Sequence, residues 1–280
     1  KKIDVKILNN QIQILCKNNR NWMMQIKFEE VRIKARLRLL QMHYDAGVGH
    51  IGGNLSALDA MLYLHHYVMS AEDQFVLSKG HAAGALYVTL WSRGILQESD
   101  LCSFHDDGTL LSGHPPPRRL EGIPVATGSL GHGLPMACGM ALARKLRKQP
   151  GQIFCLCSDG EWQEGSNWEA LIFARHHNLS NLVVLVDVNG LQGFGSTQTV
   201  ASMNDLGKHM EAFGLRTREL DGHLEASLEQ INTRSVEDRW CYLLQTVKGK
   251  GISFMENRLE WHYLPLDEAS YRQALAELNS

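Results

Sequence analysis

The sequence predicts an α/β fold, with one doubly wound, mainly parallel sheet and helices on both faces. Short apolar runs at 153–157 and 182–188 end in turn residues, and the segment between them, 164–177, has apolar residues at helical spacing. This pattern is typical of a βαβ unit with buried parallel strands. Strands and helices alternate along the rest of the chain without a linker, an internal repeat or a low-complexity segment, which favours one layered structure.

The bulk composition limits the class of protein. The 280 residues are 44% hydrophobic and 21% charged, which allows a sizeable core and argues against wholesale disorder. A net charge of −2 gives no reason to expect nucleic acid or an acidic membrane as partner. No apolar run approaches 18 residues and no signal-peptide pattern opens the chain, so a cytoplasmic location is expected. Cys155 and Cys157 alternate within an expected strand and are interpreted as core residues.

The first third of the chain is expected to be mainly helical. Residues 1–22 have no clear hydrophobic period and are interpreted as a tail or docking arm, which leaves 23–280 as the binding domain. A helix is predicted from residue 23 to Ala46. The glycine-dense segment 47–53 after it is typical of a backbone that turns tightly against a ligand. Asn54 or Ser56 is predicted to cap the next helix, 57–69.

The remaining elements follow in alternation. A short buried strand is expected at 75–77, followed by a helix through Leu86 and Leu90. Residues 105–127 are expected to form a long loop, which is more often functional than filler. A second glycine-dense segment, 126–134, precedes a predicted helix at 136–147. Beyond the central unit, a loop (193–202), a helix (203–213), an extended segment (214–220), a helix (224–232) and a last strand (240–247) are expected.

Polar residues follow both strands of the central unit. Asp159 follows the first strand after one residue, Ser158, and Asn189 comes directly after the second. The carboxyl ends of parallel strands lie at one edge of the sheet, where ligands bind in open α/β folds. The Asp159 carboxylate, the Asn189 amide oxygen and the backbone carbonyl of Leu191 are hard oxygen donors. Mg²⁺ prefers such donors and usually shares them with substrate phosphates.

The loop after the first strand indicates a phosphate held through such a cation. Asp159, Glu161 and Glu164 are close in sequence and would repel an anion, at a cost of about 4 kcal/mol for one pair about 4 Å apart. A divalent cation reverses the local field, and Gly160 leaves room for a phosphate before a helix N-terminus. Taken alone, however, Asp-Gly and Asn-Gly are also common turn pairs, so two plain turns are the alternative.

A family resemblance is carried by the spacing of these two turns and by ten short motifs. Asp-Gly, 28 intervening residues and then Asn resembles the signature of thiamine diphosphate enzymes. The motifs occur in the order seen in transketolase, from about residue 25 to 270. They are G-H-I-G-G, V-L-S-K-G-H-A, L-S-G-H-P, A-T-G-S-L-G-H-G-L, S-D-G-E-W-Q-E-G, D-V-N-G-L, E-A-F-G, D-G-H, K-G-K-G-I and W-H.

The resemblance implies roles for the residues that match these motifs. The implied metal-binding set, for Mg²⁺ or for Ca²⁺ or Mn²⁺, is Asp159, Asn189 and Leu191. The implied set for thiamine diphosphate is His81, Gly128, Ser129, Leu130, Gly160, Glu161, Asn189 and His262. The implied catalytic set is His50, His114, His262 and Glu164. The histidines would surround the ketose, and Glu164 matches a carboxylate that couples two cofactors across a subunit interface. Imidazoles suit this task because they donate, accept and shuttle protons near neutral pH.

The implied activity is transfer of a two-carbon ketol unit from a ketose or ketose phosphate to an aldose. The resemblance covers only the diphosphate-binding domain, so the chain resembles the N-terminal subunit of a split, two-gene transketolase. The family's activating glutamate lies on the pyrimidine-binding domain. A C-terminal partner subunit is therefore implied, in a homodimer or a two-plus-two assembly. Pentose phosphate, deoxy and sulfo sugars all remain open as substrates.

Two other functions are alternatives to this one. The α subunit of a 2-oxo-acid dehydrogenase also uses thiamine diphosphate, but S-K-G-H-A, G-H-P and Trp261-His262 favour the ketol transferase. A non-catalytic scaffold paralogue is disfavoured because Asp159, Asn189 and the four motif histidines are all intact. A Rossmann dehydrogenase is excluded because no G-x-G-x-x-G opens a helix after the first strand.

Overall fold

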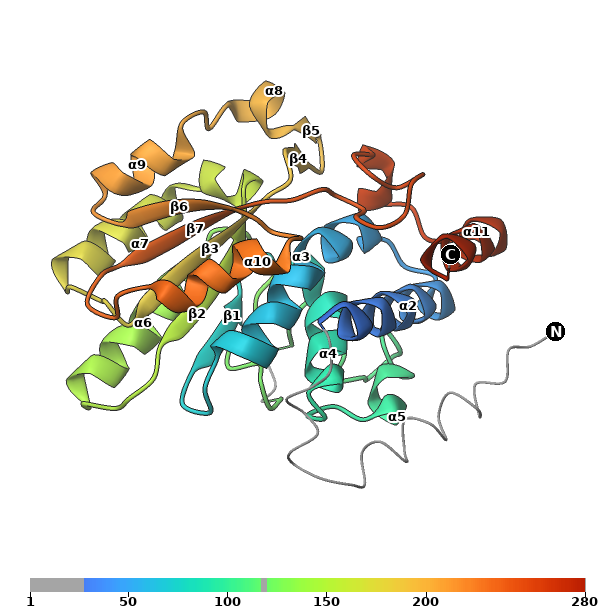
Figure 1. Ribbon diagram of the computed structural model, residues 1–280, viewed down its shortest axis with the longest axis horizontal. Coiled ribbons are helices and arrows are strands. Elements are labelled where there is room, and N and C mark those ends of the chain that lie inside the picture. The colour runs from blue at the N-terminus through green and yellow to red at the C-terminus, as the bar shows by residue number, and fades with distance from the viewer. Residues whose placement is uncertain (1–27, 117–119, 280) are drawn as a thin grey trace.

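Five strands form one sheet in which every neighbouring pair is parallel, as predicted (Figure 1). The computed structural model describes residues 28–116 and 120–279, so the predicted tail at 1–22 lies outside the described residues. The sheet order is β1-β2-β3-β7-β6. The strands are β1 (Gln74–Leu77), β2 (Ile153–Ser158), β3 (Leu182–Val188), β6 (Arg216–Asp221) and β7 (Trp240–Gln245).

The register of β2 and β3 places the two predicted polar ends together. Ser158, the last residue of β2, lies opposite Asp187 near the end of β3. The chain then leaves the sheet through Asp159 and Asn189, and the Asp159 amide donates to the Asp187 carbonyl at 3.1 Å. The predicted βαβ unit is therefore present, and its strand ends share one edge of the sheet.

Helices cover both faces of the sheet, and successive strand residues point to opposite faces. Phe154 and Leu156 belong to one apolar core, whereas Cys155 and Cys157 belong to the other, where they are fully buried as predicted. The first core is completed by α2 (Phe28–Ala46), α3 (Ile51–Tyr63), α4 (Ala83–Ser92) and α10 (Glu225–Leu228). The second is completed by α6 (Gly133–Leu146), α7 (Gly165–His176) and α9 (Leu206–Ala212) (Figure 1).

The glycine-dense segment 47–53 differs from its prediction. Helix α3 begins at Ile51, so Gly52 and Gly53 are helical, and neither Asn54 nor Ser56 caps the helix. His50 is the N-cap residue. A Cβ at Gly52 would lie 3.2 Å from both Trp261 and Lys248. Gly52 therefore serves close packing of α3 against the segment after β7, whereas Gly47, with φ +62°, lies in a turn as predicted.

Other differences concern short elements and helix ends. Helix α3 continues into a π-helical turn, Leu64–Val68, and the predicted loop at 193–202 contains elements of its own. These are the hairpin of β4 (Leu191–Gln192) and β5 (Gly195–Ser196), followed by α8 (Thr197–Ala201). The helices α5 (Glu98–Leu101) and α11 (Glu268–Leu278) were not predicted. Short 3₁₀ turns occupy Gly80–Ala82, Gly160–Gln163, Glu229–Thr233 and Leu259–His262. Within residues 28–116 and 120–279, no helix is both long enough and apolar enough to cross a membrane.

Candidate active site

The four histidines singled out in the sequence converge from four separate segments. His50 caps α3, His81 follows β1, His114 lies in the loop before α6, and His262 follows β7. The His50 ring centroid lies 5.8 Å from that of His114, 5.3 Å from that of His262 and 5.9 Å from that of His81. The rings of His81 and His262 are 5.6 Å apart. The predicted histidine set therefore forms one cluster at the carboxyl edge of the sheet.

Two close contacts explain why glycines surround this cluster. A Cβ at Gly53 would lie 3.1 Å from the His81 ring, and a Cβ at Gly80 would lie 2.7 Å from the backbone nitrogen of Gly128. Gly128 in turn lies against the His114 ring, where a Cβ would approach to 3.2 Å. The segment 128–130, which belongs to the set implied for thiamine diphosphate, thus lies beside the histidines.

The predicted metal ligands lie together beyond β2 and β3. Asp159 is 6% exposed, and its carboxylate accepts from the Gly160 and Gly190 amides, both at 2.7 Å. The Asn189 amide oxygen accepts from the Leu191 amide at 3.0 Å. One carboxylate and one amide oxygen beside a turn fit a hard divalent cation, which takes such oxygens together with those of a phosphate. Among the described residues, no group of three His, Cys, Asp or Glu side chains offers an alternative metal site.

The electrostatics around Asp159 also favour a cation. Burial, followed by the nearby carboxylate of Asp187, raises the pKa of Asp159 to about 6. Both causes disfavour a second negative charge at this position, and a bound cation would relieve both. The donor set and its surroundings therefore fit the predicted ion.

The Glu161 side chain does not face the ligand side, so it does not join Asp159 in repelling an anion there, contrary to the prediction. Its side chain is fully buried and accepts from the Ser78 hydroxyl, from the Gly131 amide at 2.8 Å and from the Ser158 amide at 3.2 Å. Burial raises its pKa, and these donors oppose that rise. The carboxylate thus ties the ends of β1 and β2 to the segment before α6. Glu164, in contrast, is exposed.

Sequence reasoning missed a buried ion pair directly behind the site. Lys79 and Asp187 are both fully buried and paired with each other. The Lys79 ammonium also donates to the Gly53 carbonyl at 3.1 Å, and Asp187 accepts from Ser56 at 2.6 Å and from Thr246. Nothing in the local pattern around either residue reveals a partner 108 positions away.

Two more polar residues at the site were also missed. The Lys248 ammonium is 3.0 Å from the Nδ1 atom of His262. The amide nitrogen of Gln192 is buried without a hydrogen-bond partner, and a Cβ at Gly160 would lie 2.9 Å from the same side chain's Oε1 atom. A buried, unpaired donor beside Gly160 fits the place where a phosphate oxygen is expected. The only sequence signal for Lys248 was its glycine-flanked K-G-K-G context.

The surroundings of the four site histidines lower the pKa of each ring, which favours the neutral form. Burial is the largest cause in each case, and it lowers the pKa of His262 to about 4 and that of His81 well below its usual range. Burial and neighbouring cations or histidines also lower the pKa of His50 and of His114. Because the Lys248 ammonium donates to Nδ1 of His262, the proton of that neutral ring lies on Nε2. The cluster can therefore offer both donors and acceptors to a polyhydroxy substrate.

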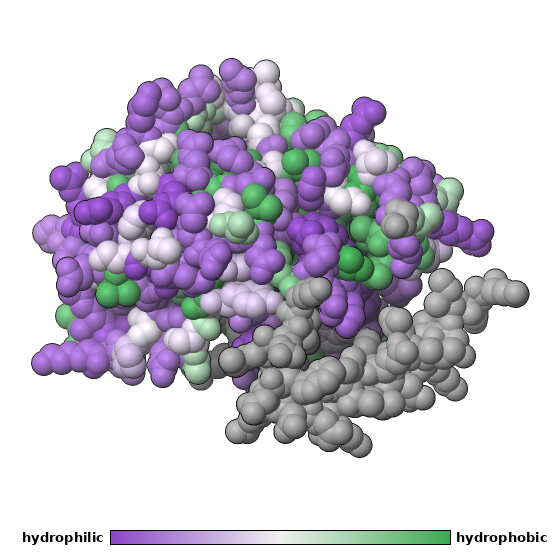
Figure 2. Space-filling model, in the orientation of Figure 1, coloured by the Kyte–Doolittle hydropathy of each residue, from purple (hydrophilic) through white to green (hydrophobic). Residues whose placement is uncertain are grey.

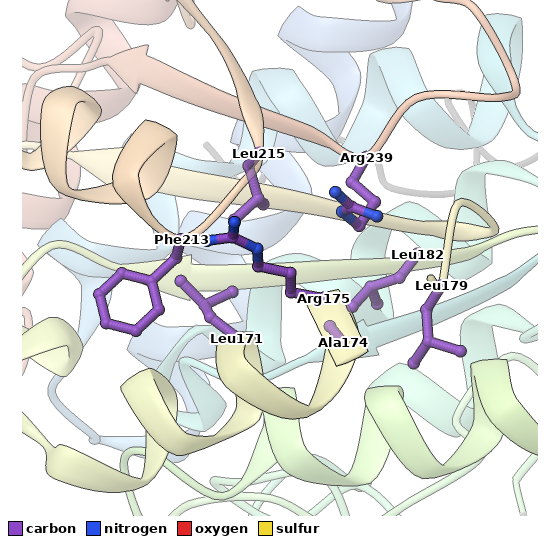
Figure 3. Close-up of a pocket in the computed structure, with 8 residues that line it drawn as sticks. All are labelled: Leu171, Ala174, Arg175, Leu179, Leu182, Phe213, Leu215 and Arg239. Carbon is purple, nitrogen blue, oxygen red and sulfur yellow. The ribbon is translucent and has the colours of Figure 1, made fainter. Parts of the chain in front are cut away.

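Two cavities lie outside the histidine cluster. A cavity of about 330 Å³ adjoins Asp159 and is lined largely by residues 197–208, together with Glu219 and Gln245. A much smaller apolar pocket lies at the opposite edge of the sheet, beside Leu182 at the start of β3 (Figure 3). Its two arginines, Arg175 and Arg239, donate to the backbone carbonyls of Ala212 and Gly214. That pocket therefore lacks the acid–base groups of the site.

The fold and site define a class of protein. It is an α/β protein with oxygen donors at one edge of the sheet, at Asp159 and Asn189, and with a histidine cluster beside them. We call this edge the oxygen-donor edge, and it fits a cation that bridges to a phosphate. Residues 31–278 match the family model described as Transketolase, thiamine diphosphate binding domain. The chain therefore belongs to the transketolase family, as its motifs indicated.

Several relatives match over nearly their whole length. One subunit of the apulose-4-phosphate transketolase of Phocaeicola vulgatus is 36% identical over 269 residues, which cover 91% of this chain and 95% of that protein. The 6-deoxy-6-sulfo-D-fructose transketolase subunit SqwG of a Clostridium species is 37% identical and covers 83% and 89%. Human transketolase is 35% identical over 88% of this chain but only 41% of its own length. The solved transketolase of Leishmania mexicana matches with a TM-score of 0.83 at 25% identity, over 91% of this chain and 41% of that one.

These comparisons confirm the predicted family, fold and transferase class. The chain corresponds to about two fifths of single-chain transketolases and to nearly all of the relatives named as separate subunits. The predicted character of an N-terminal transketolase subunit is confirmed at this level. The matching domain is one that binds thiamine diphosphate, which supports the predicted cofactor.

Proposed function

We propose that this chain is the diphosphate-binding subunit of a two-chain transketolase. It transfers a two-carbon ketol unit from a ketose or ketose phosphate to an aldose, together with a C-terminal subunit that carries the pyrimidine-binding domain. The single observation that carries this proposal is the cluster of four histidines beside the oxygen-donor edge at Asp159 and Asn189. That arrangement occurs in a chain of the same extent as relatives named as transketolase subunits.

The oxygen-donor edge would hold the cofactor through a cation. Asp159, Asn189 and the carbonyl of Leu191 would bind Mg²⁺, or Ca²⁺ or Mn²⁺ in its place. The remaining cofactor-binding set proposed is His81, Gly128, Ser129, Leu130, His262, and Gly160 and Glu161, which would offer only backbone groups to the diphosphate. When bound, thiamine diphosphate supplies the nucleophilic carbon that carries the two-carbon unit between donor and acceptor. The protein's part is to bind, orient and desolvate the reacting groups.

The histidine cluster would handle the substrate's hydroxyl and carbonyl groups. His50, His114 and His262 come from different segments, and the rings of the last two lie 5.8 and 5.3 Å from that of His50, so they would approach a bound ketose from different sides. As neutral rings they accept from hydroxyls and donate to oxygens, and His262 presents a donor at Nε2. A group of this kind contributes general acid–base catalysis of about 100- to 10,000-fold.

A partner subunit is proposed because part of the cofactor-binding surface is open. Ser129 and Glu164 are exposed, and Glu164 is the residue proposed to couple two cofactors across an interface. Phe194 is 87% exposed beside Tyr263, whose hydroxyl donates to the Gly193 carbonyl at 2.9 Å. The described atoms in view in Figure 2 are mostly hydrophilic with small separate apolar groups, so that face does not offer a continuous apolar interface. We propose at least a homodimer in isolation and a two-plus-two assembly with the partner.

The isolated chain is expected to be catalytically silent. Supplied with thiamine diphosphate, Mg²⁺, a ketose phosphate donor and an aldose acceptor, the purified chain should form no ketol-transfer product. Adding the proposed C-terminal subunit, which should also be inactive alone, should raise turnover by at least about 1000-fold, because it supplies the pyrimidine-binding half of the active site. Product formation is followed by chromatography. Robust turnover by this chain alone would sink the two-chain proposal.

Alanine substitutions of His114 and His81 are expected to have different effects on turnover and on cofactor affinity. His114→Ala should lower kcat/KM for ketose donors about 100-fold in the reconstituted enzyme, because it removes a group proposed to contact the substrate and not the cofactor. Its affinity for thiamine diphosphate should stay within a few-fold. His81→Ala should weaken cofactor binding more than it lowers turnover at saturating cofactor. Equal losses of both quantities for His114→Ala would assign that residue to the cofactor or to folding.

A further inference from the structure

Asn54 connects the backbones of two site histidines from inside helix α3. Its amide nitrogen donates to the His50 carbonyl at 2.8 Å and to the His81 carbonyl at 3.0 Å. Its amide oxygen accepts from the Ala85 amide at 2.7 Å. Both side-chain N–H groups and the oxygen are therefore used, and the residue is 1% exposed.

The orientation of this amide is set by its partners. The Ala85 N–H requires an acceptor and the two histidine carbonyls require donors, so the reversed amide would lose all three bonds. The side chain also has little room to move. A Cβ at Gly84 would lie 3.2 Å from its oxygen, and His43 lies 3.5 Å from its nitrogen. The amide is thus held in one position between α3 and α4.

The backbone at His50 needs this support. His50 has φ +66°, in the left-handed region that costs a non-glycine residue free energy and persists only when its surroundings hold it. The His50 amide donates to the His262 carbonyl at 3.1 Å, and the His50 carbonyl accepts from the Asn54 side chain. One chain of hydrogen bonds therefore joins His262, His50, Asn54 and His81.

We propose that Asn54 is a positioning residue that sets the distance between the His50 and His81 rings. Because the His50 amide is bonded to the His262 carbonyl, Asn54 also sets, through His50, the position of the His262 ring. This inference rests on the proposed function of the histidine cluster and adds a residue to it. Asn54 touches neither cofactor nor substrate in this role, because its polar atoms are all bonded to backbone groups. It acts through the carbonyls that carry the rings.

The test compares two substitutions of Asn54 with a matched control. Asn54→Asp keeps the size and the acceptor for Ala85 but places a second oxygen against the two carbonyls. Asn54→Ser is too short to reach both carbonyls and keeps a polar group. The control, Thr89→Val, removes one buried hydrogen bond on α4, from the Thr89 hydroxyl to the Ala85 carbonyl at 2.8 Å, without touching a site histidine.

Imidazole ¹H–¹⁵N spectra of the full chain provide the first measurement, with signals assigned by His50→Gln and His81→Gln. Both Asn54 variants should shift the His50 and His81 signals, and kcat of the reconstituted enzyme should fall about 10- to 100-fold, as expected for reacting groups misplaced by about 1 Å. Thr89→Val should change neither quantity. Should Asn54→Asp fail to fold, Asn54→Ser decides.

Wild-type imidazole signals and wild-type kcat in Asn54→Ser would overturn the proposal. The two proposals fail separately. Shifted signals in the Asn54 variants, combined with no ketol transfer by the wild-type chain reconstituted with its partner subunit, would leave the positioning role intact and contradict the proposed function. Unchanged signals in the Asn54 variants, combined with ketol transfer by the wild-type reconstituted enzyme, would contradict the positioning role and leave the proposed function intact.

Discussion

Asp159→Ala is expected to weaken the binding of thiamine diphosphate about 100- to 1000-fold in the reconstituted complex. Asp159 supplies the single carboxylate of the proposed donor set, and the other two donors, at Asn189 and Leu191, are neutral oxygens. One charge pair at an effective dielectric near 20 is worth about 4 kcal/mol, which corresponds to about three orders of magnitude in affinity. Calorimetric titration with the cofactor, with and without Mg²⁺, measures the loss.

Asp205→Ala provides the matched control for this experiment. Asp205 lines the same cavity of about 330 Å³ as Asp159, but it pairs with Lys208 at 3.1 Å and lies outside the donor set. Its removal should leave cofactor affinity within about twofold. The wild-type complex should release little heat with the cofactor when Mg²⁺ is absent. Tight binding that is independent of Mg²⁺ would remove the proposed cation site.

Lys79→Met is expected to lower the free energy of unfolding by about 3 to 5 kcal/mol, because it leaves the Asp187 carboxylate buried without its counter-charge. Burial alone would raise the pKa of Asp187, but the Lys79 ammonium and the Ser56 and Thr246 hydroxyls bring it below its ordinary value. Without Lys79 the burial cost is no longer offset. Urea denaturation of the full chain, followed by circular dichroism, measures the change.

Two further variants test the cause of that loss. Lys208→Met removes an exposed lysine whose pair with Asp205 is worth little, and it should change stability by less than about 1 kcal/mol. The double variant Lys79→Met/Asp187→Asn leaves no buried charge and should recover part of the loss. A change below about 1 kcal/mol for Lys79→Met alone would contradict the buried pair.

The fold, and the proximity of the residues proposed for the site, could be predicted because they depend on local patterns. Apolar runs that end in Asp-Gly and Asn-Gly report buried strands and their last residues, and parallel strands necessarily bring those ends to one edge. Asp159 and Asn189 were placed together on this ground alone. The four histidines were selected by motif, and the structure brings all four into one cluster.

The start of helix α3 at Ile51 could not be predicted from the local sequence pattern. Glycine density at 47–53 suggested a turn, since glycine disfavours helix interiors by about 1 kcal/mol. The close approach of Gly52 to Trp261 and of Gly53 to His81 favours glycine at these two helical positions, because a Cβ there would lie only 3.2 and 3.1 Å from its neighbour. The partners in those contacts come from segments far along the chain, so the local pattern carries no sign of them.

The sequence by itself determined the sheet, the edge at which Asp159 and Asn189 meet, and the membership of the histidine cluster. Only the tertiary structure decided which charges are buried and what each polar group bonds. It turns Glu161 inward onto the Ser158 and Gly131 amides and pairs Lys79 with Asp187. The physical reason is that periodicity reports the face on which a residue lies, whereas a hydrogen bond or ion pair depends on which distant segment is packed against that face.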